Sequence, residues 1–186
     1  TLTENYASLG GAVLGAAGSR TDIVNSTLTA NDAVTGGAIA ISSGAIANIE
    51  SSTIYINGAS SIDGRAIDVD GTGSRVRADN SVVSGNTIDA ANYDVSVRNG
   101  GEFIGRASFF STETGLAFND YGGNIFADDV GLAGLGALAN NGGPVYTMLP
   151  DVEGPLIAAG QRGSLGIAAG IQDLGEPSPS VGAPRA

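Results

Sequence analysis

The sequence predicts an all-β protein: a right-handed parallel β-helix of about five coils with three short strands each, followed by an irregular C-terminal cap. Three observations lead to this prediction. Landmark residues recur every 26–30 residues, short apolar segments alternate with polar residues at a period of two, and 30 glycines interrupt the chain. A repeat of this length is typical of a solenoid, whose stacked coils together bury inward faces that no single coil can bury alone.

Asparagine marks the repeat at spacings of 26, 26 and 29 residues. The four asparagines are Asn5, Asn31, Asn57 and Asn86. An aliphatic residue precedes each of them by three positions: Leu2, Leu28, Ile54 and Val83. Stacking places equivalent residues about 4.8 Å apart, and asparagine tolerates the left-handed backbone of a tight corner. We therefore expect one aliphatic column inside the solenoid and one asparagine ladder at a turn.

Glycines form a second series at the expected coil corners. They are Gly10, Gly11, Gly36, Gly37 and Gly64. The segments that follow them, such as "GGAIAIS" at 36–42 and "RAIDVDG" at 65–71, alternate apolar and polar residues, which is the period of a strand. The sequence "GGAVLG" lacks the Lys-Ser/Thr pair of a phosphate-binding loop, so we interpret it as a structural corner.

Three regions follow from these patterns. Residues 1–129 contain the coils, 130–170 form a closing segment, and 171–186 form an extended tail that contains proline. Within the closing segment, "GLAGLGALANN" suggests a short helix or an irregular crossing that caps the last coil. The chain starts inside a repeat, so we expect an open first coil that pairs with the remainder of a longer precursor or with another copy.

Two stretches resemble known families. "VNSTLTANDAVTGGAIAI" at 24–41 and "ADNSVVSGNT" at 78–87 resemble repeats of pectate-lyase-like right-handed β-helix surface proteins and of polymorphic outer membrane proteins. Residues 123–160 are similar to the closing segment of the choice-of-anchor Q family. The matching motif residues are Asn141, Gly142, Gly143, Pro144, Pro150 and Gly160. The family's later Asp-Gln-Arg-Gly is replaced at 172–175, and its final Asp-Ile-Gly-Ala box is missing. The resemblance implies a secreted or surface-displayed β-helix and no particular activity.

Composition narrows the classes of partner and chemistry. The net charge is −11, with eight arginines and no lysine, which argues against nucleic acid as a partner. The absence of Cys and His removes thiol chemistry and the usual general base and zinc ligand. No apolar run is long enough for a transmembrane helix. We expect an extracellular or cell-surface location, with other copies, surface glycans or surface proteins as partners.

Acidic residues supply the few candidates for chemistry. Asp68 and Asp70 in "DVDGTGS" could contribute oxygen ligands to a Ca²⁺ ion, and no other cofactor is expected. They also form, with Asp128 and Asp129, the candidate carboxylate pairs for glycoside hydrolysis. The arginines nearest to them are Arg65, Arg75, Arg77, Arg98 and Arg106. Alternation of sign along a strand favours a solvated outer face for these charges, so we name no catalytic residue.

Two functions remain open from the sequence. The first is a non-enzymatic secreted or surface protein, a fragment of a larger precursor that acts as a structural rod, an adhesin or an assembly component. The alternative is a polysaccharide-active enzyme, a lyase or glycoside hydrolase, or a carbohydrate-binding module on the same fold. Converging Asp and Arg side chains in a groove would favour the alternative.

Overall fold

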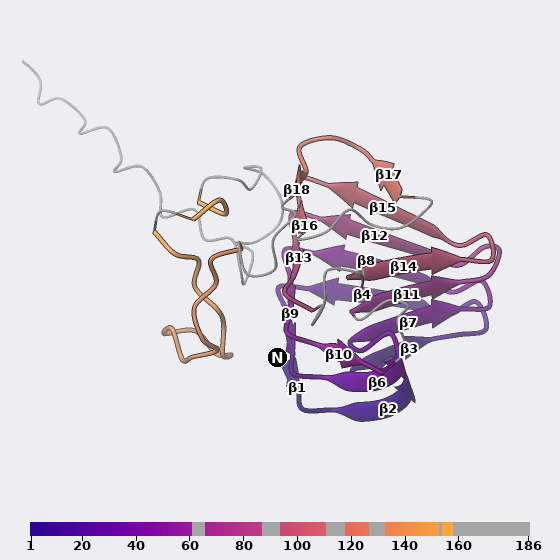
Figure 1. Ribbon diagram of the computed structural model, residues 1–186, viewed down its shortest axis with the longest axis horizontal. Helices are drawn as coiled ribbons and strands as arrows, with labels where there is room; N and C mark the ends of the chain where they lie inside the picture. Colours follow the sequence, from indigo (N-terminus) through magenta and orange to yellow (C-terminus); the bar gives the residue numbers. More distant parts are fainter. Residues whose placement is uncertain (61–65, 87–93, 111–117, 127–132, 153, 158–186) are drawn as a thin grey trace, which may run out of the picture.

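The computed structural model describes residues 1–60, 66–86, 94–110, 118–126, 133–152 and 154–157. These residues form an all-β structure that contains no helix. Parallel strands stack into a solenoid of about four turns, with the first turn at the bottom of Figure 1 and the last at the top. The predicted fold class is therefore confirmed, with slightly fewer turns than the five expected.

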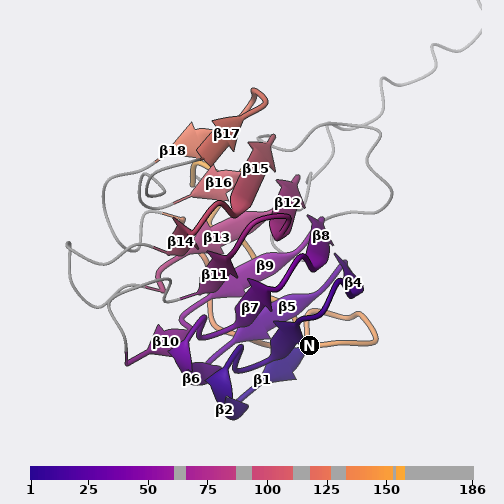
Figure 2. The same ribbon diagram turned by 90° about the vertical axis from the view of Figure 1, so that its right-hand side faces the viewer.

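The strands belong to four parallel sheets that surround one core (Figure 2). The six-stranded sheet consists of β1 (Leu2–Thr3), β5 (Thr27–Thr29), β9 (Thr53–Tyr55), β13 (Val82–Ser84), β16 (Phe109–Phe110) and β18 (Ile125–Phe126). The three-stranded sheet consists of β2 (Tyr6–Leu9), β6 (Asp32–Thr35) and β10 (Gly58–Ala59). After β1, β5 and β9, the chain passes from the six-stranded sheet to the three-stranded one.

The chain then enters the other two sheets. The four-stranded sheet consists of β3 (Val13–Gly15), β7 (Ile39–Ser42), β11 (Ile67–Asp70) and β14 (Val95–Arg98). The five-stranded sheet consists of β4 (Arg20–Val24), β8 (Ile46–Glu50), β12 (Arg75–Asp79), β15 (Glu102–Arg106) and β17 (Phe118–Asp120). It carries the candidate site.

The solenoid has four parallel sheets, so a complete turn has four strands, whereas the sequence predicts three strands per coil. The additional strand lies in the three-stranded sheet, where Ala7, Ala33 and Ala59 align in register. Ala33 and Ala59 are buried. A methyl group fills this inward position, so the segment lacks the alternating large apolar residues by which a strand is recognised in a sequence.

The core consists of inward columns of like residues. Leu28, Ile54 and Val83 are fully buried and lie in register with Leu2. On the opposite side, Ile39, Ile67 and Val95 form an equivalent column in the four-stranded sheet. Each column buries apolar surface between successive turns, which contributes roughly 25 cal/mol per Å².

The four asparagines stack at one end of the six-stranded sheet. Asn5 donates from Nδ2 to Asn31 Oδ1 at 2.8 Å, Asn31 to Asn57 at 2.9 Å, and Asn57 to Asn86 at 2.9 Å. Each accepting Oδ1 also takes the backbone N–H of the asparagine one turn earlier. The residue before each asparagine has a positive φ, as a left-handed corner requires. Asp94 continues this pattern, because its Oδ1 accepts the Asn86 N–H at 3.1 Å.

A serine ladder, which the sequence analysis missed, bounds the other end of the six-stranded sheet. The backbone N–H of Ser26, Ser52 and Ser81 each donates to the hydroxyl of the serine one turn later, at 3.0–3.1 Å. Ser108 donates in the same way to Asn124 Oδ1 at 3.0 Å. The signal was present, because Ser26, Ser52 and Ser81 each precede a ladder asparagine by five positions.

The corner glycines lie where the chain leaves the three-stranded sheet. Gly10 and Gly36 have φ values of +59° and +63°, and a Cβ on Gly36 would lie 2.4 Å from a backbone carbonyl oxygen. Gly11 has no such φ, but its Cβ would lie 2.1 Å from the carbonyl oxygen of Gly37 in the next turn. These positions therefore need glycine for conformation and for close stacking. Gly64 lies outside the described residues.

The described part of the closing segment lies along the side of the solenoid, whereas we expected it across the last turn. Ala133, Leu135 and Leu156 pack on Val82 and Phe109, which point outward from the six-stranded sheet. Figure 1 shows this segment, orange to yellow, beside that sheet. An outward apolar column needs a cover, which explains the lateral position. Residues 158–170 and 171–186 lie outside the described residues.

The Asn-Gly-Gly-Pro motif forms the tip of an irregular antiparallel loop. Backbone bridges join Leu135 to Pro150 and Ala139 to Thr147. Asn141 closes the tip by donating from Nδ2 to the Thr147 carbonyl and hydroxyl oxygens at 2.9 and 3.0 Å. Gly142, Gly143 and Pro144 are exposed at this tip, Pro150 is buried, and Gly160 lies outside the described residues. The loop reaches the first turn, where Thr1 Oγ1 donates to the Tyr146 carbonyl oxygen at 2.8 Å.

Candidate functional site

The outer face of the five-stranded sheet carries most of the described arginines. Its strands alternate buried and exposed residues, so every second side chain points to solvent. Register places Arg77 beside Asn48, and Asp79 between Glu50 and Arg106. Charged side chains from four successive turns therefore lie in fixed rows on one surface.

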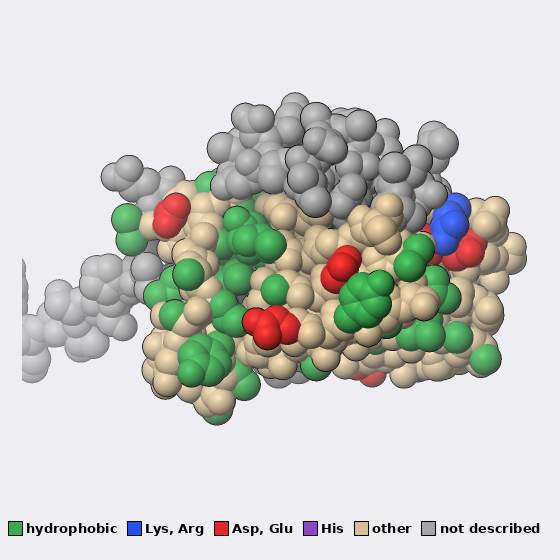
Figure 3. Space-filling model, turned by 60° about the horizontal axis from the view of Figure 1, so that its bottom comes forward, with side chains coloured by type: hydrophobic (Ala, Val, Ile, Leu, Met, Phe, Trp, Pro, Cys, Tyr) green, Lys and Arg blue, Asp and Glu red, His purple; other side chains and the backbone are tan. Residues whose placement is uncertain are grey.

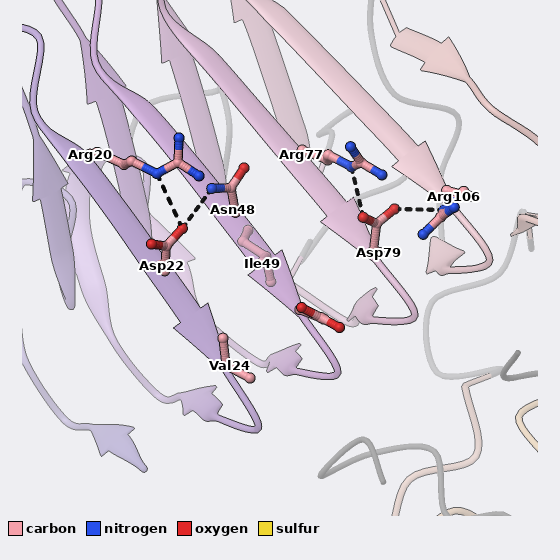
Figure 4. A pocket seen from close by; sticks show the side chains of 9 residues that line it. Arg20, Asp22, Val24, Asn48, Ile49, Arg77, Asp79 and Arg106 are labelled. Atoms are coloured by element: carbon pink, nitrogen blue, oxygen red, sulfur yellow. Dashed lines mark hydrogen bonds and ion pairs between the residues drawn. The ribbon is translucent and has the colours of Figure 1, made fainter. Parts of the chain in front are cut away.

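Asp79 holds two arginines at the centre of this face. Arg77 donates from Nε to Asp79 Oδ2 at 2.7 Å, and Arg106 donates from Nε to Asp79 Oδ1 at 3.1 Å (Figure 4). Both guanidinium groups are about half exposed, whereas the Asp79 side chain is mostly covered. Each carboxylate oxygen is thus engaged by one arginine, and the three groups together carry one net positive charge.

A second ion pair lies two strands away on β4. Arg20 Nε lies 3.7 Å from Asp22 Oδ1, and the same oxygen accepts a hydrogen bond from Asn48 Nδ2 at 2.6 Å. Between the two ion pairs the surface forms an open groove of about 540 Å³. The lining residues are Arg20, Asp22, Val24, Asn48, Ile49, Glu50, Arg77, Asp79 and Arg106.

Arg75 lies on the same strand as Arg77 but outside the groove. It donates from Nε to Glu102 Oε2 at 2.5 Å, and Asn119 donates to Glu102 Oε1 at 3.0 Å. Its side chain is 52% exposed, close to the 46% of Arg77. The strand therefore offers an internal comparison between a groove arginine and a similar arginine outside it.

The calcium candidates Asp68 and Asp70 lie on another face, in the four-stranded sheet. Arg98 binds Asp68 in a bidentate manner, with Nε and Nη2 each 2.9 Å from a carboxylate oxygen. Asn99 donates to Asp70 Oδ1 at 2.6 Å, and Arg98 Nη2 lies 3.8 Å from Asp70 Oδ2. Arginine and asparagine thus contact the oxygens that a cation would need, which weighs against the calcium site suggested by the sequence but does not test it.

The remaining candidates for chemistry cannot be placed. Asp128, Asp129 and Arg65 lie outside the described residues. Within the part of the chain that the structure describes, no group of three or more His, Cys, Asp or Glu side chains is arranged to hold a metal ion. The carboxylates of Asp68, Asp79 and Glu102 contact arginine donors instead.

The groove was not predicted as a site, although two of its arginines, Arg77 and Arg106, were expected on a solvated outer face. Arg20 and Glu50 were not among the residues that the sequence analysis singled out. They meet Arg77 and Asp79 only through the register of β4, β8 and β12. Aligning the coils on the asparagine ladder is the signal that could have found this convergence.

The first-turn end of the solenoid is a second surface with distinct properties. Strands β1, β2, β3 and β4 form one edge of all four sheets. Figure 3 shows apolar side chains spread over this end. They include Tyr6, which is 77% exposed, and Leu9 and Leu14, which are about half exposed.

No family model, curated protein or solved structure matches this chain. Nor do the described residues include a helix long and apolar enough to cross a membrane.

Proposed function

We propose that this protein is a non-enzymatic β-solenoid that acts as a rod and binding surface outside the cell. The observation that carries this proposal is that arginine side chains contact two of the surface carboxylates. Both oxygens of Asp79 and both oxygens of Asp68 accept hydrogen bonds from arginine. An arginine on each oxygen leaves a carboxylate fewer lone pairs with which to attack substrate, activate water or transfer a proton. Arginine-locked carboxylates instead fix the geometry of a surface.

Three further features support the proposal, the first two its location outside the cell and the third its role as a rod. The repeats and the closing motif resemble pectate-lyase-like surface proteins and the choice-of-anchor Q family. The net charge of −11 suits a solvated outer surface. Open edges of four sheets at the first turn can pair with a strand from a second copy or from a longer precursor.

A turnover assay tests the proposal. The protein is incubated with neutral and acidic polysaccharides, and new reducing ends and unsaturated lyase products are measured over time. We expect no product above the level of a heat-denatured sample. Product formation that Asp79→Asn or Glu50→Gln abolishes would overturn the proposal.

The alternative, a polysaccharide-active enzyme or a carbohydrate-binding module, is favoured by the groove itself, where Asp and Arg side chains converge as this alternative requires. For an enzyme, one pair of carboxylates is relevant. Glu50 and Asp79 are cross-strand neighbours on the groove. Two carboxylates on adjacent strands approach the separation of about 5 Å that retaining glycosidases use. The two arginines on Asp79 weigh against an enzyme, because each contacts one of the carboxylate oxygens that the reaction would use.

A further inference from the structure

We propose that the groove on the five-stranded sheet binds the carboxylate or sulfate group of an acidic glycan between Arg77 and Arg106. This inference rests on the proposed role as a binding surface and names the ligand class for it. Its starting point is the geometry of the two guanidinium groups around Asp79.

The two guanidinium groups are oriented but only partly used. Within the described residues, Arg77 and Arg106 donate hydrogen bonds only through Nε, and both bonds go to Asp79. Their terminal nitrogens, Nη1 and Nη2, therefore remain available on a half-exposed surface. Figure 4 shows the two groups on either side of Asp79 at the groove. A planar guanidinium group matches the oxygens of carboxylate and sulfate groups in a bidentate manner.

The rest of the groove restricts what can carry that oxyanion. Asp22 and Glu50 line the same groove, and the whole chain has a net charge of −11. A dense polyanion such as a nucleic acid would be repelled by these charges. An acidic peptide would place further carboxylates against Asp22 and Glu50, where like charges repel.

An acidic glycan avoids this repulsion because neutral hydroxyl groups separate its charges. Hydroxyl groups can donate to the Asp22 carboxylate and can accept from Asn48, which lies beside it. The groove also runs across strands β4, β8, β12 and β15, so it offers an extended ligand several contacts in a row. Charge and hydrogen-bonding capacity thus favour separated oxyanions on a polyhydroxylated chain.

Binding can be followed directly at the two arginines. In ¹⁵N-labelled protein, the Nε–Hε signals of Arg77 and Arg106 are monitored by NMR while oligosaccharides are added. The probes are a hyaluronan tetrasaccharide, a chondroitin sulfate tetrasaccharide, maltotetraose and inorganic sulfate. We expect at least one of the two acidic tetrasaccharides to shift both signals and maltotetraose to leave them in place.

Three variants test whether binding depends on the groove arginines or on surface charge in general. Arg77→Gln and Arg106→Gln should each weaken binding about tenfold, equivalent to about 1.4 kcal/mol. Arg75→Gln, on the same strand with similar exposure, should stay within about twofold of the wild type. All three side chains are exposed, and circular dichroism checks that each variant folds.

Several results would overturn the assignment. If Arg77→Gln left the affinity unchanged, or if Arg75→Gln lowered it as much as Arg77→Gln, the groove would not be the binding site. Maltotetraose that binds as well as the acidic probes would contradict the need for an oxyanion. Inorganic sulfate that binds as tightly as the tetrasaccharides would make the groove a site for free anions. Absence of binding with no turnover would refute this inference alone, whereas turnover would refute the proposed non-enzymatic role.

Discussion

Replacing Asn57 with alanine should destabilise the protein more than the same change at any exposed asparagine. Asn57 Oδ1 accepts the backbone N–H of Asn31 at 3.1 Å and its Nδ2 at 2.9 Å, and Asn57 Nδ2 donates to the Leu28 carbonyl oxygen at 3.0 Å. Alanine would leave the buried Asn31 N–H without an acceptor, at a cost of about 2 kcal/mol, and would remove side-chain hydrogen bonds worth about 1 kcal/mol more. We expect a loss of about 3 kcal/mol in unfolding free energy.

Urea denaturation followed by circular dichroism measures this loss, and the ladder supplies its own control. Asn5 belongs to the same ladder but is exposed, and its side chain accepts no hydrogen bond from the described residues. Asn5→Ala should therefore cost less than about 1 kcal/mol. Equal losses for Asn5→Ala and Asn57→Ala, or a loss below about 1 kcal/mol for Asn57→Ala, would refute the reasoning that burial makes the ladder stabilising.

Three further predictions concern the other faces. Arg98→Ala leaves the Asp68 carboxylate, which is 3% exposed, without its bidentate partner, so unfolding free energy should fall by about 3 kcal/mol and Asp68→Asn should restore part of it. Gly36→Ala should lower the melting temperature much more than Gly44→Ala, because both residues have positive φ but only Gly36 meets a carbonyl oxygen at 2.4 Å. Calcium or a chelator should leave the melting temperature unchanged, since Arg98 already contacts the candidate ligands; a calcium-dependent rise would establish the ion site.

The fold could be predicted from the sequence because its inward and corner residues stack on their equivalents in the next turn and therefore repeat. Asn31 and Asn57 recur at one spacing, and Leu28 and Ile54 keep the same distance from them. A residue that must stack on its own equivalent is restricted at every turn, and this restriction is visible as a repeat. The serine ladder could have been found in the same way, but serine is frequent in loops and its spacing attracts less attention.

The groove could not be predicted in this way because outward residues need not repeat. Arg77 aligns with Asn48 one turn earlier and with Asp22 two turns earlier, so one column holds a cation, an amide and a carboxylate. Their spacings of 26 and 29 residues match the asparagine ladder, but the change of residue type from turn to turn hides the repeat unless the coils are first aligned on that ladder. The position of the closing segment was also hidden, because its apolar residues could cover an end or a side equally well until Val82 and Phe109 were seen to point outward.

A substitution at Asp79 tests whether affinity in the proposed glycan site comes from the fixed positions of the two arginines or from their charge alone. Asp79→Asn keeps the size of the side chain and makes the groove more positive by one charge. If attraction between charges dominates, acidic tetrasaccharides should bind the variant more tightly. We expect weaker binding instead, by a few fold, because the asparagine places an NH2 donor where one of the two carboxylate oxygens accepts from Arg77 or Arg106. The two guanidinium groups would then rotate freely and lose conformational entropy when the ligand binds. Titration of wild type and variant with the same tetrasaccharide decides between these outcomes, and tighter binding by the variant would show that the fixed arginine pair is not what selects the ligand.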